Sequence, residues 1–216
     1  LKDIIREKET EIACITETHL NQNKGILVDG YVFFGRAREG KAGGGVGMFV
    51  KNSLKQKVSP HYSDRDIEII WISVHRENER PLHVGVYYGK QENAHQEEIR
   101  DEMDKLSEEI QERKTTGEII LCMDANAKIG LMGEPVSRNG KLIEEVFEEC
   151  QLVVMNAANI CNGVITRQNR AREEEKSAID LIVATYEASR LFKYMKIDEL
   201  GEHRIRNKKE SDHNTI

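Results

Sequence analysis

Ser211-Asp212-His213-Asn214-Thr215-Ile216 is the stretch of this chain that says most about its fold, because its Asp-His pair can be read together with three earlier acidic positions. Those positions are Glu17, Asp124 and Asp180, and each lies at an end of a short apolar run typical of a β-strand. A sheet holds the side chains at its strand ends rigidly, so carboxylates placed there can converge on a metal ion. Strands also commonly end in polar turn residues, which is the simpler interpretation of any single position. Four such positions in one chain favour a site.

Seven short motifs follow one another along the chain. They are Thr16-Glu17-Thr18-His19-Leu20, Gly43-Gly44-Gly45-Val46-Gly47, Val86-Tyr87-Tyr88, Met123-Asp124-Ala125-Asn126-Ala127, Arg138-Asn139-Gly140-Lys141-Leu142, Ser177-Ala178-Ile179-Asp180 and Ser211-Asp212-His213. Each motif is weak by itself, but their order and spacing together are specific. From Glu11 to Ile216 the chain resembles the endonuclease/exonuclease/phosphatase (DNase I-like) superfamily, and within it the endonuclease domain of non-LTR (LINE-type) retrotransposons.

The composition is compatible with one domain over residues 1–216. A chain of 216 residues can bury a substantial core, and no Pro- or Ser-rich linker divides it. No apolar run reaches the length of a membrane span, and residues 1–20 lack the pattern of a signal peptide. We therefore expect an intracellular protein without a membrane partner, and the resemblance implies the nucleus. The cysteines at positions 14, 122, 150 and 161 form no C-x-x-C pair, which favours reduced core thiols over a zinc site or disulfides.

The net charge of −6 argues mildly against non-specific binding of nucleic acid, since Lys and Arg neutralise the phosphates. Local basic patches can still guide a DNA strand. The sequence offers two, one of Arg167, Arg170 and Arg172 and one of His203, Arg204, Arg206, Lys208 and Lys209. Most short basic clusters are solvated loops, so phosphate contact and a plain surface loop are balanced alternatives here.

Apolar periodicity predicts both helices and strands. Ile4 and Ile5, with Leu1, indicate a helix at the start of the chain. Short apolar runs predict strands near residues 11–16, 31–34, 45–50, 67–75, 82–88, 119–123, 152–154, 163–166 and 178–184. Short turns between the strands up to residue 88 imply antiparallel pairing. Helical spacing predicts a helix from about Asn93 to Arg113 and a second amphipathic helix marked by Leu142, Ile143, Val146 and Phe147.

These elements predict an α+β fold of two packed, mainly antiparallel or mixed β-sheets flanked by helices. The resemblance implies the same arrangement, a four-layer αββα sandwich. In that superfamily a first strand precedes the helix that opens this chain, and a closing strand begins where this sequence stops at Ile216. We therefore expect a domain that lacks its first and last strands, a fragment or decayed copy of a longer polyprotein.

The resemblance also implies roles for individual residues. Glu17 and Asp212 match the residues that bind Mg²⁺, and carboxylate oxygens suit Mg²⁺ or Mn²⁺. Asp124 matches the acid that orients or deprotonates the attacking water, and Asn126 matches the amide that holds the phosphate. His213 is expected to face the phosphate.

A carboxylate beside an imidazole fixes its tautomer and favours its charged form, which is the role implied for Asp180 beside His213. Tyr87 aligns with an active-site tyrosine that donates a hydrogen bond to phosphate, although a tyrosine on a strand usually packs. The Gly43–Gly47 run lacks the Lys-Ser/Thr of a P-loop, so we interpret it as a structural turn before a strand.

Three positions depart from the family pattern. Nothing supplies the asparagine of the missing first strand, Met123 replaces the usual glycine before Asp124, and Arg167 follows Thr166 where related elements often have Trp. The residues and the resemblance together predict a Mg²⁺-dependent DNA endonuclease domain. The resemblance alone implies that it nicks duplex DNA to prime reverse transcription and that a reverse transcriptase domain follows downstream. The alternatives are a phosphatase-like or domesticated member of the superfamily, and a non-catalytic remnant.

Overall fold

The computed structural model describes residues 2–20, 25–38, 43–169, 172, 174–203 and 211–216. Along the chain its elements are α1 (Lys2–Glu7), β1 (Ile12–Thr16), β2 (Tyr31–Arg36), β3 (Val46–Lys51), η1 (Asn52–Lys57), β4 (Val58–Tyr62), β5 (Glu68–Val74), β6 (Leu82–Tyr88), α2 (Gln96–Thr116), β7 (Glu118–Asp124), α3 (Arg138–Glu149), β8 (Leu152–Val154), η2 (Met155–Ala157), β9 (Cys161–Asn162), β10 (Arg167–Gln168), β11 (Lys176–Ser177), β12 (Asp180–Thr185), α4 (Tyr186–Ser189) and β13 (Met195–Lys196).

Two larger sheets form the centre of the molecule. One has six strands in the order β4-β5-β6-β7-β12-β8, and the other has three in the order β1-β3-β2. The six-stranded sheet is mixed, because β6 and β7 run parallel while its other neighbours are antiparallel. A parallel pair needs a crossover connection, and α2 provides it. Two short ribbons, β10-β11 and β9-β13, complete the strand pairing of the described residues.

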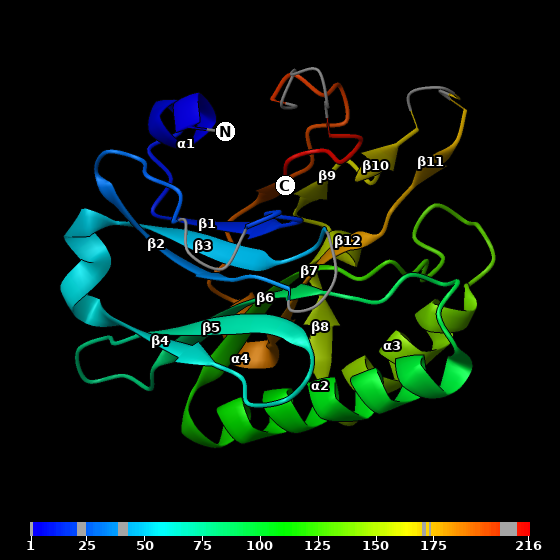
Figure 1. Cartoon of the computed structure of the whole chain (residues 1–216), viewed down its shortest axis with the longest axis horizontal. Helices are drawn as coiled ribbons and strands as arrows, with labels where there is room; N and C mark the ends of the chain where they lie inside the picture. Colours follow the sequence, from blue (N-terminus) through cyan, green and yellow to red (C-terminus); the bar gives the residue numbers. More distant parts are fainter. Residues whose placement is uncertain (1, 21–24, 39–42, 170–171, 173, 204–210) are drawn as a thin grey trace.

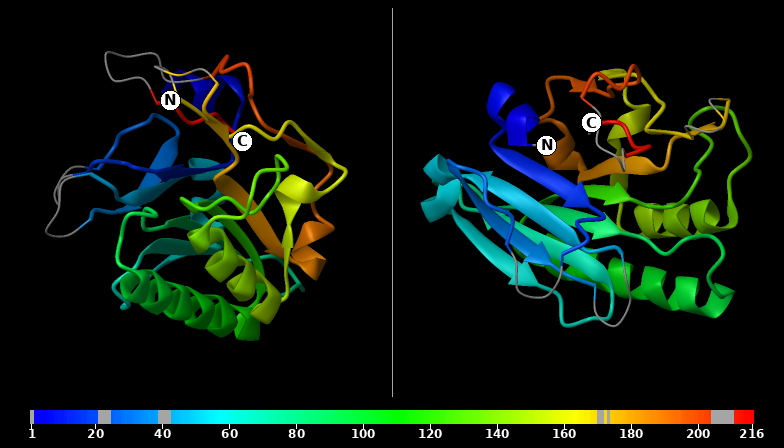
Figure 2. Two further views of the ribbon diagram at one scale, coloured as in Figure 1. Left: turned by 90° about the vertical axis from the view of Figure 1, so that its right-hand side faces the viewer. Right: turned by 45° about the horizontal axis from the view of Figure 1, so that its top comes forward.

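The two sheets pack face to face, with helices on the outside (Figures 1 and 2). Between the sheets, Val46, Met48 and Val50 of β3 meet Ile70 and Ile72 of β5. On the other face of the six-stranded sheet lies the core beneath α2 and α3, which contains Trp71, Ile99, Leu106, Ile143 and Phe147. Successive side chains of a strand point to opposite faces of the sheet, so the same strands contribute apolar side chains to both cores.

The short helix α1 covers the outer face of the three-stranded sheet. Ile5 packs there with Val28 and Phe49. The molecule is thus layered as helix, sheet, sheet and helices (Figure 1). This confirms the expected α+β class with mixed sheets and outer helices. All pairings among the strands from β1 to β6 are antiparallel, as the short connections predict.

The predicted strand at residues 163–166 is wrong, and a side chain explains why. The backbone N–H groups of Val164 and Ile165 donate to Oε1 of Glu199 at 2.7 and 2.8 Å, so a carboxylate takes the place of a neighbouring strand. β9 ends before this segment and β10 begins after it. The apolar run alone could not reveal a partner 34 residues away.

The edge strand β4 was not predicted, since its sequence contains Pro60 and lacks an apolar run. Proline is tolerated at a sheet edge, where it removes no ladder hydrogen bond. No helix in the described part of the chain is long and apolar enough to cross a membrane.

Candidate active site

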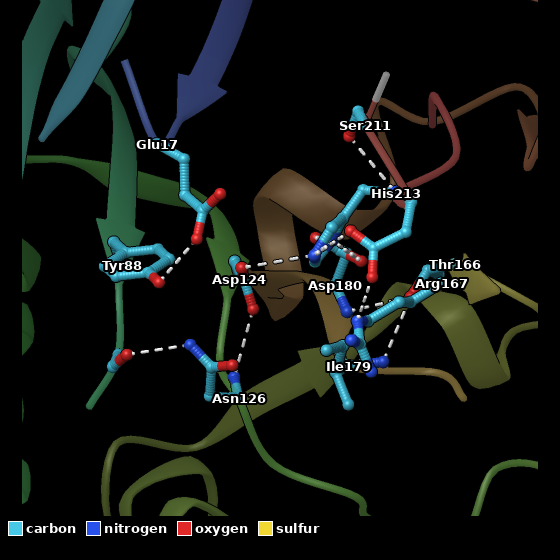
Figure 3. A network of polar contacts seen from close by, with 12 residues as sticks. Glu17, Tyr88, Asp124, Asn126, Thr166, Arg167, Ile179, Asp180, Ser211 and His213 are labelled. Atoms are coloured by element: carbon cyan, nitrogen blue, oxygen red, sulfur yellow. Dashed lines mark hydrogen bonds and ion pairs between the residues drawn. The ribbon is translucent and has the colours of Figure 1, made fainter. Parts of the chain in front are cut away.

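The centre of the site is a pair of aspartates on neighbouring strands. Asp124 is the last residue of β7 and Asp180 is the first residue of β12, and the antiparallel register places them directly opposite each other. His213 joins them from the C-terminal segment, which is tied to β10 by a bridge between His213 and Arg167. Three segments distant in sequence therefore meet at one end of the six-stranded sheet (Figure 3).

His213 is held by Asp180 and faces Asp124. Its Nδ1 lies 3.0 and 2.9 Å from the two carboxylate oxygens of Asp180, and its Nε2 lies 3.9 Å from Oδ2 of Asp124. Burial alone would lower the pKa of this imidazole. The hydrogen bond to Asp180 and the negative charges of Asp180, Asp124 and Asp212 outweigh burial and raise the pKa of His213 to about 9. At neutral pH the ring is a cation.

Asp124 lies in the most buried position of the cluster, with its side chain only 2% exposed. Burial and the neighbouring charge of Asp180 raise the pKa of Asp124 to about 7, even though His213 and the backbone N–H of Asn126 favour its ionised form. That N–H donates to Oδ1 of Asp124 at 3.2 Å. A carboxyl group with a pKa near neutrality can accept a proton during a reaction at pH 7.

The second half of the site is formed by Glu17 and Tyr88. The Tyr88 hydroxyl donates to Oε1 of Glu17 at 2.7 Å, and the charge of Glu17 is felt at Asp124. Glu17 and Asn126 both have positive φ, at 50° and 46°. Such backbone strain in residues other than glycine gathers at functional sites. The Asn126 side chain is fixed by donation to the Gly89 carbonyl at 2.9 Å.

Thr166 positions Asp180 through its backbone. The fully buried Thr166 hydroxyl accepts from the N–H groups of Ile179 and Asp180, at 3.0 and 2.9 Å. Thr166 also accepts the backbone N–H of Asn214 at 2.6 Å, so the same residue connects Asp180 to the segment that carries His213. In the sequence, Thr166 stands out only as the neighbour of Arg167.

Asp212 forms an ion pair with Arg167, whose Nε lies 2.8 Å from Oδ2 of Asp212. The other carboxylate oxygen of Asp212 is 3.8 Å from Nε2 of His213. Arg167, the residue that departs from the family pattern, is therefore part of the site. Of the two basic patches, the structure describes Arg167, Arg172 and His203; Arg170, Arg204, Arg206, Lys208 and Lys209 lie outside the described residues.

Tyr87 does not join the cluster. Its side chain is fully buried in the core beneath α2, where its hydroxyl donates to Oε1 of Glu102 at 2.7 Å. Successive side chains of a strand point to opposite faces of the sheet, so Tyr87 and Tyr88 cannot both reach the site. The placement expected for Tyr87 is taken by Tyr88. The doubled tyrosine in the sequence was the signal, and only the pairing of the strand decides between the two.

The other expected site residues lie together, but in a different grouping from the one expected for a metal. Asp124, Asp180 and His213 each offer a ligand atom, and these atoms lie within 4.8 Å of one another, so this cluster could hold a metal ion. Glu17 and Asp212 are not members of that group among the described residues. Glu17 accepts a hydrogen bond from Tyr88 (Figure 3), and Asp212 forms an ion pair with Arg167. The two carboxylates of the group, Asp124 and Asp180, offer the oxygen ligands that a hard divalent cation prefers, and the imidazole could bind a metal only after losing its proton.

Comparison with known proteins agrees with this geometry. Residues 82–216, more than half of the chain, match the model of a family described as endonuclease-reverse transcriptase. A comparison with curated protein sequences finds no match.

Solved structures show the same fold. The human Nocturnin catalytic domain with bound sulfate anion aligns with a TM-score of 0.60 at 12% identity, covering 85% of this chain and 72% of that one. ANGEL2, a 2′,3′-cyclic phosphatase, aligns with a TM-score of 0.59 at 15% identity, covering 86% and 72%. Together with the family match, these findings show that the chain belongs to the endonuclease-reverse transcriptase family of the endonuclease/exonuclease/phosphatase superfamily, whose chemistry is the hydrolysis of phosphodiester bonds.

Proposed function

We propose that this domain nicks double-stranded DNA with Mg²⁺, or with Mn²⁺ in its place, as the endonuclease of a non-LTR retrotransposon polyprotein. The nick would prime reverse transcription by a domain encoded downstream, and this would take place in the nucleus. The observation that carries the proposal is the meeting of Asp124, Asp180 and His213 at one end of the sheet. The family match, whose description names both activities, supports the nucleic-acid substrate.

Each residue has a role that follows from its surroundings. His213, a cation held by Asp180, donates a hydrogen bond to the scissile phosphate and stabilises its developing charge. Asp124 orients the attacking water and takes its proton, which its raised pKa allows. The Asn126 side chain has a second amide N–H besides the one bonded to Gly89, and it donates that hydrogen to the phosphate. The Tyr88 hydroxyl gives its single proton to Glu17, so Tyr88 takes the active-site position that the sequence predicts for Tyr87 and orients that carboxylate.

Glu17 and Asp212 are the proposed ligands of the divalent cation, and the cluster of Asp124, Asp180 and His213 is the alternative ligand set. Bound there, the cation would act as a Lewis acid that neutralises charge on the phosphate and on the leaving oxygen. The carboxylate of Asp212 is paired with Arg167, which neutralises it. The Mn²⁺ titrations described below separate the two ligand sets.

A second candidate is hydrolysis of a different phosphoester. The structural match to ANGEL2, described as a 2′,3′-cyclic phosphatase, favours it, since the same fold serves that reaction. A domain that folds and binds without cleaving is the third possibility. Wild-type protein that neither nicks plasmid nor releases phosphate would identify it.

The test is nicking of supercoiled plasmid by purified protein in Mg²⁺, in Mn²⁺ and in EDTA. Asp124→Ala and His213→Ala should each lower the rate by about 10²- to 10⁴-fold, since general-base and charge-stabilising groups contribute on that scale. Asp104→Ala and His95→Ala are matched controls, because both residues are exposed and belong to α2 and its N-cap rather than to the cluster. Nicking that survives in either site variant contradicts the roles above. Release of inorganic phosphate from a monoester, with the plasmid left intact, identifies the phosphatase instead.

A further inference from the structure

The three glycines that precede β3 lie against the backbone that carries Glu17. The N–H groups of Thr18 and His19 donate to the carbonyls of Gly45 and Gly44, at 3.1 and 2.9 Å. Gly43, Gly44 and Gly45 have φ of 84°, 67° and 85°, a region that favours glycine. The turn is therefore built to place its carbonyls where the residues after Glu17 need acceptors.

Arg38 and Glu68 hold this turn. A Cβ added at Gly44 would overlap the Arg38 guanidinium, so the arginine packs directly on the glycine backbone. The Nε of Arg38 donates to one oxygen of Glu68, and the other oxygen of Glu68 accepts the N–H of Gly45 at 2.6 Å. Both side chains are largely shielded, with 27% and 20% exposed.

The same arginine also contacts Tyr88. Its guanidinium carbon lies 5.3 Å from the centroid of the Tyr88 ring, within the range of a cation–π interaction. The Tyr88 hydroxyl in turn donates to Glu17. Two chains of contacts thus run from the Arg38–Glu68 pair to Glu17. One runs through the tyrosine ring to the carboxylate, and the other runs through the glycine turn to the backbone.

We propose that Arg38 and Glu68 are positioning residues that fix both the backbone and the carboxylate of Glu17 for binding a divalent cation. This inference rests on the proposed function, in which Glu17 is a ligand of that cation. Groups that orient a metal ligand commonly change metal affinity by about 10- to 100-fold when they are removed. A partly exposed ion pair contributes little to stability. If the Arg38–Glu68 pair served stability alone, its removal should therefore leave the protein folded and its affinity for the metal unchanged.

The experiment is titration of purified protein with Mn²⁺ in the absence of DNA, with free Mn²⁺ measured by electron paramagnetic resonance. Glu17→Gln sets the scale for loss of a ligand. We expect Arg38→Gln and Glu68→Gln to weaken Mn²⁺ binding by about 10-fold. Arg38→Lys should recover part of the affinity, because it keeps a cation over the ring and beside Glu68. Arg80→Gln is the matched control, since Arg80 forms an ion pair with Glu118 at 3.0 Å that does not involve the site.

The outcomes distinguish the inference from the proposed function beneath it. Wild-type affinity in Arg38→Gln and Glu68→Gln, together with weak binding in Glu17→Gln, overturns the positioning role and leaves the metal site intact. Wild-type affinity in Glu17→Gln overturns the proposed ligand role of Glu17 itself. Asp212→Asn and Asp180→Asn, titrated in parallel, show which ligand set binds the cation. Thermal midpoints confirm folding, and if Arg38→Gln does not fold, Glu68→Gln carries the same test.

Discussion

At the scale of single residues, the site depends on which of two adjacent tyrosines faces it. Tyr88 contacts Glu17 and lies under Arg38, whereas Tyr87 contacts Glu102 in the core. Burial raises the pKa of both hydroxyls above the ordinary value, and the neighbouring carboxylate adds to the effect in each case. Both therefore remain protonated donors at neutral pH. They differ in the carboxylate that accepts the hydrogen bond, which is Glu17 for Tyr88 and Glu102 for Tyr87.

Exchanging each tyrosine for phenylalanine should separate activity from stability. Tyr88→Phe removes the donor to Glu17 and should lower the plasmid-nicking rate by about 10-fold or more with little change in thermal midpoint. Tyr87→Phe leaves an oxygen of the buried Glu102 without its partner and should destabilise the fold by about 1–3 kcal/mol while sparing the rate per folded molecule. Nicking assays and urea unfolding of both variants check this. The reverse pattern would return the active-site role to Tyr87.

At the scale of elements, β4, β5 and β6 share a polar network beside their apolar cores. The Ser73 hydroxyl lies 2.8 Å from Nε2 of His61 and 2.8 Å from Nδ1 of His83, whose Nε2 lies 2.9 Å from the Thr116 hydroxyl. Burial, followed by the positive charge of Arg113, lowers the pKa of His83 to about 4. The ring is thus neutral in the folded protein at neutral pH and links three strands to the end of α2.

This network predicts a loss of stability in weak acid. The folded pKa of His83 lies below the unfolded value near 6.5, so between these values the unfolded chain binds a proton that the folded chain does not. The stabilising contribution is complete above pH 6.5 and is lost as the pH falls toward 4. We expect wild type to lose on the order of 1 kcal/mol more than His83→Gln between pH 7 and pH 5, after allowing for screening by polar neighbours.

Urea unfolding of both proteins at the two pH values measures this difference. His95→Gln serves as the control, because that histidine is exposed at the start of α2. An equal pH dependence in wild type and His83→Gln would show that His83 is protonated in the folded state at pH 5.

At the scale of the whole molecule, the site joins parts that are otherwise separate. Glu17 follows a strand of the three-stranded sheet, Asp124 and Asp180 belong to the six-stranded sheet, and His213 lies in the C-terminal segment. A ligand that binds these groups only when they are assembled stabilises the whole fold. Burial first, and then the neighbouring charge of Asp180, raise the pKa of Asp124, so keeping this carboxylate ionised costs the folded protein stability when no cation is bound.

Divalent cation should therefore raise the thermal midpoint. At about 100 times its dissociation constant, Mg²⁺ or Mn²⁺ contributes about 2.7 kcal/mol, which corresponds to roughly 5–10 °C for a domain of this size. Glu17→Gln removes a proposed ligand and should shift far less with cation. Asp124→Asn should be at least as stable as wild type in EDTA, because it removes a buried charge beside Asp180. Scanning calorimetry with cation and with EDTA checks both points. The same cation-induced shift in Glu17→Gln as in wild type would place the ion elsewhere.

The sequence by itself determined the α+β class, most of the strands and both long helices, because side-chain periodicity is a local property that survives without any partner. It also brought forward Asp124, Asp180 and His213, which the structure places in one cluster, and Asn126, whose backbone N–H donates to Asp124. Glu17 and Asp212, which the sequence also brought forward, bind Tyr88 and Arg167 beside that cluster. A single polar residue at a strand end is ordinary, so the motifs identified these residues through the resemblance of their order and spacing to those of the superfamily.

Only the tertiary structure decided the contacts between segments distant in sequence. The pairing of β6 with its neighbours chose Tyr88 over Tyr87, and the side chain of Glu199 replaced the strand predicted at residues 163–166. Asp212 was paired with Arg167, and Arg38 with Glu68, across gaps of tens of residues. The physical reason is the same in each case. A strand pattern specifies that alternate side chains point to opposite faces of the sheet. The packing of the two sheets decides which of those faces meets the site and which charged side chains pair with each other.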